Sequence, residues 1–277
     1  MRFPTCLMSM SFLLAMTIIA AAQPAYNLPE DPDVPVLKVW DLFLAEGGDS
    51  PPLILVYADG RVVKQVSDNR EDDYVITIEE ERLQELLGKI IEGNQFFEMD
   101  VEVIKAEVLT ERKLARLRPG FEFRIELNLA DRAHVVSVGN SWVYQRLKRG
   151  HQARYKDASM FHQFLNVEVL CRKLSSWALV GGEESMQEIL DSANREIQAA
   201  HPGSPKVTNA SIASLKSTNG RVNMCLNAAA AKGNPALQVF VGKTKGEDEF
   251  DLEVKVAKKI NIHGEGGGIA RPKPRME

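Results

Sequence analysis

The chain carries one uninterrupted alternation of apolar and polar residues, from residue 121 to residue 129. Its apolar members are Phe121, Phe123, Ile125, Leu127 and Leu129. Successive side chains of a β-strand point to opposite sides, so this pattern predicts a strand with one buried face and one solvated face. Strands of this kind are typical of antiparallel sheets that pack against helices on one side.

Shorter strand signals flank this segment. They cover residues 37–44, 53–57, 61–66, 74–78 and 134–138. Asp59 and Gly60 lie between the second and third of these runs and supply the positive φ angles that a tight hairpin turn requires. We therefore expect an antiparallel sheet in the N-terminal part of the chain.

The strongest helix signal follows the first four strand signals. Its apolar residues share one helical face and are Leu83, Leu86, Leu87, Ile90 and Ile91. Thr77 and Glu80 have the spacing of a capping box, and Gly93 lies where a glycine would end the helix. Two further helices are predicted at residues 159–177 and 183–200.

The last third of the chain changes to strand patterns after the proline-containing segment 202–205. Its four predicted strands are residues 207–216, 221–226, 237–243 and 250–256. The chain thus divides into a signal peptide (1–22), an extended lead-in (23–35), an α+β domain (36–201), a β-rich domain (206–262) and a flexible tail (263–277). The expected fold class is α+β, an N-terminal antiparallel sheet with packed helices followed by a small β-rich C-terminal unit.

The first 22 residues have the features of a cleavable secretory signal peptide. Arg2 precedes an apolar run that ends in Ala20 and Ala22, the small residues that a signal peptidase prefers before a cut at Gln23. The alternative is an uncleaved membrane anchor, but a spanning helix needs about 20 apolar residues. We therefore expect a secreted or periplasmic protein with no stable membrane span after cleavage.

Charge and motifs narrow the class of function. The formal net charge is -4, and loss of Arg2 with the signal peptide would make it -5, so nucleic acid is not an expected partner. The sequence contains no histidine pair at metal-ligand spacing, no phosphate-binding glycine loop and no nucleophile elbow. We accordingly predict no catalytic, metal-binding or cofactor-binding residue, and we favour a binding protein over an enzyme.

Residues 142–156 form the most suggestive surface segment, because they contain five arginines and lysines and no acid. Cationic side chains bind a polyanion through ion pairs, and aromatic rings between them stack on sugars or guanidinium groups. The alternative is a solvated basic connector. The residues predicted to bind a polyanion are Trp142, Arg146, Lys148, Arg149, Arg154, Tyr155 and Lys156.

Cys171 and Cys225 are the two cysteines that would remain after cleavage. In an oxidising compartment they are candidate partners of one disulfide. The alternative is that Cys171, on the apolar face of its predicted helix, is a buried small apolar residue.

The order of features in residues 47–177 resembles that of a known family. The features are the pair Gly47 and Gly48, the turn at Asp59 and Gly60, the leucine-rich helix, Phe96 and Phe97, and the paired strands within 121–138 with a following helix. In this order the chain resembles emfourin-type protein inhibitors of metalloproteases and also uncharacterised exported bacterial proteins. The resemblance implies inhibition of a secreted protease.

The chain departs from the inhibitor pattern directly after the glycine pair. Asp49, Ser50 and two prolines stand where the inhibitors have the apolar and glycine residues of their binding loop. No inhibitory residue is therefore assigned to this sequence.

The leading expectation is an exported noncatalytic binding protein whose ligand is a polyanion, such as an anionic polysaccharide, or another exported protein. Two alternatives stay open. One is a protein inhibitor of a secreted protease, and the other is a hydrolase whose site is assembled from residues far apart in the sequence.

Overall fold

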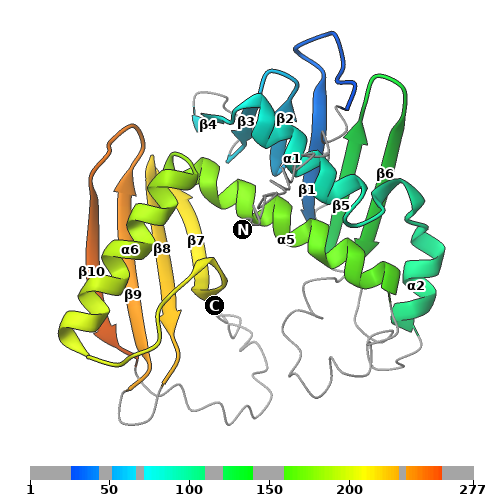
Figure 1. Ribbon diagram of the computed structural model, residues 1–277. Helices are drawn as coiled ribbons and strands as arrows, with labels where there is room; N and C mark the ends of the chain where they lie inside the picture. The colour runs from blue at the N-terminus through cyan, green and yellow to red at the C-terminus, as the bar shows by residue number, and fades with distance from the viewer. Residues whose placement is uncertain are drawn as a thin grey trace, which may run out of the picture.

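The computed structural model describes residues 26–43, 52–66, 72–109, 121–139, 159–230 and 235–257. These residues form two antiparallel sheets and four α-helices (Figure 1). The expected α+β class, with an N-terminal sheet followed by a smaller β-rich unit, is confirmed. The predicted signal peptide, the glycine pair at 47–48, the basic segment 142–156 and the predicted tail lie outside the described residues.

The first sheet has six strands in the order β4-β3-β2-β1-β5-β6, and all neighbouring strands are antiparallel. The strands are β1 (Pro35–Phe43), β2 (Ile54–Tyr57), β3 (Arg61–Lys64), β4 (Tyr74–Thr77), β5 (Phe121–Asn128) and β6 (Ala133–Gly139). Each strand segment expected in this region is present. The long alternating segment forms β5, which pairs with β1 on one side and β6 on the other.

One face of this sheet, which we call the inner face, is buried. Val39 on β1 lies beside Ile125 on β5, which lies beside Val136 on β6. All three side chains are fully buried. The alternate residues of the same strands form the opposite face, which we call the outer face.

Three helices pack on the inner face. They are α1 (Glu80–Ile91), α2 (Val101–Leu109) and α5 (Ser159–Val180), and the short 3-10 helix η2 (Phe96–Glu98) lies between the first two. Figure 1 shows α1 and α5 crossing the same side of the sheet, and α5 contacts β2, β3 and β4. Phe123 on β5 meets Phe164 on α5 edge to face, with 6.4 Å between ring centroids.

The start of α1 differs from the capping box expected at Thr77 and Glu80. Thr77 is the last residue of β4 and pairs with Arg61 on β3, so it belongs to the sheet and not to the helix terminus. The N-cap residue is Glu79, and no side chain caps the helix there. The capping-box prediction is therefore wrong, although the acidic first turn still favours this helix terminus.

The described part of the lead-in, residues 26–34, is anchored to α1. The backbone nitrogen of Tyr26 donates to Oε1 of Gln84 at 2.8 Å, and Nε2 of Gln84 donates to the carbonyl oxygen of Tyr26 at 3.3 Å. Tyr26 and Leu28 also pack against the hydrophobic core. The segment therefore contributes contacts to the first unit before β1 begins at Pro35.

The second sheet has four strands in the order β10-β9-β8-β7, all antiparallel. They are β7 (Ile212–Thr218), β8 (Arg221–Ala228), β9 (Leu237–Thr244) and β10 (Phe250–Val256). A 3-10 helix, η4 (Asn209–Ser211), occupies the start of the segment expected to be the first of these strands. Helix α6 (Glu183–Ala200) contacts β9 and β10 and covers one face of this sheet (Figure 1).

The packing of α6 links it to the second sheet. The boundary expected at residues 202–205 lies between α6 and the sheet on which it packs, whereas Gly181 and Gly182 separate α6 from α5. Both glycines have positive φ angles, of 98° and 124°. The chain therefore turns between the two units at a site that favours glycine.

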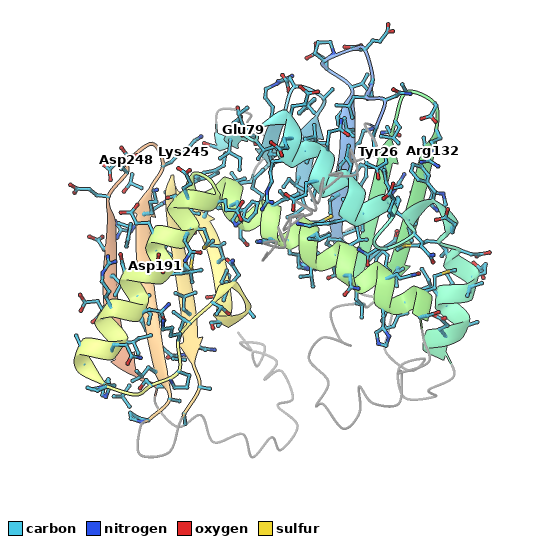
Figure 2. All side chains as sticks on the ribbon, viewed as in Figure 1. Tyr26, Glu79, Arg132, Asp191, Lys245 and Asp248 are labelled. Carbon is cyan, nitrogen blue, oxygen red and sulfur yellow. The ribbon has the colours of Figure 1, made fainter. Side chains whose placement is uncertain are left out.

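Polar contacts fix the two units at this turn. Nζ of Lys243 on β9 donates to the carbonyl oxygen of Val180 at 2.8 Å and to Oγ of Ser185 at 2.6 Å. The hydroxyl groups of Tyr74 and Ser217 are 2.7 Å apart. Figure 2 places Lys245 beside the first unit, and its Nζ lies 5.1 Å from the ring centroid of Tyr74.

Candidate functional site

The seven residues predicted to bind a polyanion lie outside the described residues. They belong to the segment between β6, which ends at Gly139, and α5, which begins at Ser159. Their role therefore stays a prediction. None of the helices in the described part of the chain is long and apolar enough to cross a membrane.

Cys171 and Cys225 are both free thiols. Cys171 is buried on α5 in the core of the first unit, and burial together with Glu168 raises the pKa of its thiol to about 12. Cys225 lies on β8 between the buried residues Met224 and Leu226, so its side chain points away from α6. The candidate disulfide is not formed, because the two thiols belong to different layers of the molecule.

A row of side chains crosses all six strands on the outer face of the first sheet. In sheet order it consists of Val75, Val63, Leu55, Lys38, Glu126 and Val135. Val75 and Val135, at the two edges, are 56% and 41% exposed. The row therefore presents apolar side chains to solvent on both edge strands.

Two arginines of the outer face stack on aromatic rings. The guanidinium carbon of Arg124 lies 4.9 Å from the ring centroid of Trp40, and that of Arg61 lies 4.5 Å from the ring centroid of Tyr57. At these distances the face of each ring attracts its cation. The outer face thus combines tryptophan, tyrosine and arginine, the residue types enriched at protein interfaces.

The cations of the outer face are paired with acids. Lys38 donates to Glu126 at 2.7 Å, and Arg61 donates to Asp59 at 2.6 Å. Burial alone would raise the pKa of Glu126, but hydrogen bonds from Lys38 and Asn128 lower it below its ordinary value. Neighbouring charges of opposite sign therefore cancel much of the field above this face.

A second cluster of charged side chains lies between α5 and the inner face of the first sheet. Nε of Arg172 donates to Oε1 of Glu168 at 2.8 Å, and its Nη1 donates to Oδ2 of Asp41 at 3.0 Å. Glu168 is fully buried, and its Oε2 has no hydrogen-bond partner within the described residues. Burial also lowers the pKa of Lys64 to about 8, partly offset by Asp41.

This inner cluster connects α5 to β1 through Arg172, so its evident role is structural. The adjacent Cys171 is a poor nucleophile near neutral pH, because a thiol must ionise to react and its pKa is about 12. No group of His, Cys, Asp and Glu that could hold a metal ion occurs among the residues that the structure describes. His134, for example, lies 3.0 Å from the carbonyl oxygen of Met99 and meets the ring of Phe96 edge to face.

No family model, curated protein or solved structure matches this chain.

Sequence reasoning missed both charged groups of the first unit. Glu168 and Arg172 are four residues apart in α5, and this spacing is a usable signal for an ion pair. The outer-face row had no such signal, because its members come from six segments whose register the sequence does not specify.

Proposed function

We propose that this chain is an exported noncatalytic binding protein and that it binds another exported protein through the outer face of its first sheet. The observation that carries the proposal is the row from Val75 to Val135, which lies beside the stacked Arg124–Trp40 and Arg61–Tyr57 pairs. Exposed apolar area next to rigid aromatic and arginine side chains is typical of protein-binding surfaces. The predicted signal peptide supports a secreted or periplasmic location.

The charge pattern of the outer face favours a protein over a polyanion as its ligand. Lys38 and Arg61 already donate to carboxylates at 2.7 and 2.6 Å. A polyanion would have to displace these carboxylates, whereas a protein offers apolar side chains that bury Val75 and Val135 and cover the Lys38–Glu126 pair between them with its charges still paired.

The test uses the exposed edge valines. In coprecipitation from the secreted or periplasmic fraction of the producing cells, Val75→Lys/Val135→Lys should reduce recovery of the partner at least tenfold, since two buried apolar contacts would become charges. Val169→Lys is the matched control, because Val169 is equally exposed but lies on α5. A partner recovered equally with all three chains would overturn the proposal.

Polyanion binding is a second candidate, supported by the acid-free basic sequence at residues 142–156. Charge reversal at Arg146, Lys148 and Arg149 should abolish retention of the exported chain on a sulfated-polysaccharide column. Unchanged retention would exclude this segment as the binding site.

Protease inhibition is the third candidate and rests on the resemblance of residues 47–177 to emfourin-type inhibitors. A panel of secreted metalloproteases at micromolar inhibitor concentration tests it. If the protein partner is itself a protease that keeps its full activity in the complex, the inhibitor hypothesis fails while the binding proposal stands.

A further inference from the structure

Strand β10 is the outermost strand of the second sheet, and among the described residues it pairs with β9 alone. An edge strand presents backbone N–H and C=O groups that can pair with a further strand. All seven residues of β10 pair with β9 in one unbroken register, so the strand is regular along its whole length. Figure 1 shows β10 on the side of the second sheet that lies away from the first unit.

The other three edge strands are short, interrupted or contacted by other elements. Strand β4 has four residues, and β7 has a register shift between Ile212 and Ser214. Strand β7 also meets the first unit, where the hydroxyl groups of Ser217 and Tyr74 are 2.7 Å apart. Strand β6 contacts helix α2. Short length, bulges and a covering helix are common ways to protect an edge, and β10 carries charged side chains instead.

The side chains of β10 form an apolar row on the α6 side and a charged row on the other side. Leu252 and Val254 pair with the buried residues Val241 and Val239 of β9, which places the even-numbered residues on the α6 side. The apolar row is Phe250, Leu252, Val254 and Val256, and the charged row is Asp251, Glu253 and Lys255. The first three apolar residues pack against the hydrophobic core, whereas Val256 is 55% exposed.

The order of the charges selects one register for antiparallel pairing of β10 with β10 of a second copy. With Val254 opposite its own counterpart, Glu253 of each copy lies opposite Lys255 of the other, and Leu252 lies opposite Val256. Centring the pair on any other residue from Asp251 to Lys255 brings like charges opposite each other, which destabilises a sheet. A slip by one residue would set the apolar row of one copy beside the charged row of the other.

The ion pair within β10 is compatible with this register. Nζ of Lys255 lies 2.7 Å from Oε2 of Glu253, and the two side chains are 54% and 60% exposed. An exposed pair of this kind contributes little to stability. An ammonium group has three donors, so Lys255 can keep Glu253 of its own strand and also bind Glu253 of a second copy.

We propose that the exported chain forms a two-fold symmetric dimer in which the two β10 strands pair antiparallel about Val254. The two four-stranded sheets then form one continuous sheet, and Leu252 of each copy covers the exposed Val256 of the other. Since the two-fold axis runs perpendicular to the sheet, both α6 helices lie on the same side of it. The dimer goes beyond the proposed protein-binding function, because β10 belongs to the second sheet and not to the outer face of the first.

Charge reversal in the exported chain tests the register. Glu253→Lys and Lys255→Glu each place two pairs of like charges across the interface, so each variant should dimerise about tenfold more weakly than the wild type or worse. An equimolar mixture of the two variants brings opposite charges together again and should form a heterodimer. Sedimentation velocity measures the dissociation constants. A wild-type chain that stays monomeric up to about 100 µM would overturn the proposal, and so would single variants that dimerise normally or a mixture that stays monomeric.

Two control variants separate this interface from the rest of the surface. Glu102→Lys is matched to Glu253→Lys, because Glu102 is also an exposed acid paired with a lysine of its own element, Lys105 on α2, at 2.7 Å. The outer-face variant Val75→Lys/Val135→Lys is the second control, so the dimer and the proposed function can fail separately. Both should dimerise like the wild type, and loss of the dimer in either would place the interface elsewhere and overturn the proposal.

Cysteine cross-linking locates the two-fold axis. Opposite Cα atoms of an antiparallel pair are roughly 4.5–5.5 Å apart, which is within disulfide range, so Val254→Cys should cross-link two copies under oxidising conditions. In the same register the two Leu252 residues are four positions apart, roughly 13 Å, so Leu252→Cys should not cross-link. Both variants carry Cys225→Ala to remove the other accessible thiol, and a nonreducing gel gives the readout. No cross-link at Val254, or an equal yield at Leu252, would overturn the proposed pairing.

Discussion

The two sheets have the same architecture and differ in what the face opposite their packed helices presents. Each is antiparallel, and each has one face packed against a long helix, α5 on the first sheet and α6 on the second. The first sheet presents a row that ends in the exposed valines Val75 and Val135. The free face of the second sheet presents Arg221 paired with Asp251, and Phe240 beneath the ammonium group of Lys255. The two faces therefore differ in where their exposed apolar side chains lie: Val75 and Val135 are on the edge strands β4 and β6 of the first sheet, whereas Phe240, 39% exposed, is on the inner strand β9 of the second.

The units also differ in how they bury charge. The first encloses Glu168 and pairs it with Arg172 within α5, and Arg172 donates a second hydrogen bond to Asp41 on β1. The second buries Lys243, which donates to the carbonyl oxygen of Val180 at the end of α5. In the first unit, Arg172 thus links the buried Glu168 to the partly exposed Asp41 of the sheet, whereas in the second the buried Lys243 binds the C-terminal end of α5 and fixes one unit to the other.

The largest expected effect comes from breaking the first arrangement. Arg172→Met leaves the Glu168 carboxylate buried without its partner, so the free energy of unfolding should fall by about 3–5 kcal/mol. Urea denaturation followed by circular dichroism measures it. In the double variant with Glu168→Leu the loss should be smaller, because the orphaned charge is gone. A double variant as unstable as Arg172→Met alone would show that the carboxylate is not the cause.

A smaller loss is expected from the second arrangement. Lys243→Met removes two hydrogen bonds from a charged donor to Val180 and Ser185, so the free energy of unfolding should fall by about 2–3 kcal/mol. The same denaturation experiment checks it, and proteolysis near Gly181 and Gly182 should become faster. If Lys243→Met loses more unfolding free energy than Arg172→Met, the contact between the units contributes more to stability than the charged cluster within the first unit.

The sequence predicted the positions of the helices and strands better than the contacts that each of them makes in the folded protein. The alternation at Phe121–Asn128 and the apolar face of Glu80–Ile91 gave the correct strand and helix because local periodicity determines both. The capping box at Thr77 failed because pairing with Arg61 holds this residue in the sheet. The proline-containing segment 202–205 likewise suggested a boundary after α6, yet α6 packs on β9 and β10, which follow it in the chain. Proline and glycine positions mark turns but do not specify which elements pack together.

The same limit explains the candidate sites. Glu168 and Arg172 could have been paired from their spacing, but their link to Asp41 depends on how α5 crosses the sheet. The small cavity that Leu86 on α1 and Trp177 on α5 line forms only where these two helices lie side by side, although about 70 residues of chain separate them. Contacts between distant segments depend on tertiary packing, which no local pattern encodes.

Two glycines give a matched test of backbone constraint in the two units. At Gly60, φ is +83° and a Cβ would lie 2.1 Å from the carbonyl oxygen of Ile78, so Gly60→Ala should cost about 2 kcal/mol or more of unfolding free energy. At Gly242, a Cβ would meet Nη2 of Arg221 at 2.4 Å. Because this flexible side chain can move aside, Gly242→Ala should cost only the exposed ion pair between Arg221 and Asp251. The expected loss of unfolding free energy is below about 1 kcal/mol.

Thermal unfolding of the two alanine variants measures this difference. A Gly242→Ala variant at least as destabilised as Gly60→Ala would mean that Arg221 is held rigidly across the second sheet. In that case the side chains on the face of the second sheet opposite α6 would be held as firmly as the backbone turn at Gly60 in the first unit.

The smallest expected effect is a pH dependence of stability between pH 7.5 and 9, which arises from titrating groups of the first unit. Lys64 has a folded pKa of about 8 against an ordinary value of 10.5, because burial disfavours its charge. Above pH 8 the folded chain therefore loses this proton before the unfolded chain does. The unfolding free energy should rise with pH from about 8 to 10.5 through Lys64, since the unfolded state then binds more protons.

Cys171 opposes this rise at higher pH. Burial raises the pKa of its thiol from 9.0 to about 12, so above pH 9 the unfolded chain ionises first and the unfolding free energy should fall through this group. Denaturation midpoints between pH 7.5 and 9 should therefore increase in the wild type and stay level in Lys64→Met. Cys171→Ala should extend the increase beyond pH 9. If Lys64→Met keeps the wild-type rise, the titrating group lies elsewhere, and the contrast between a first unit with buried titrating charge and a second unit fixed by Lys243 no longer holds.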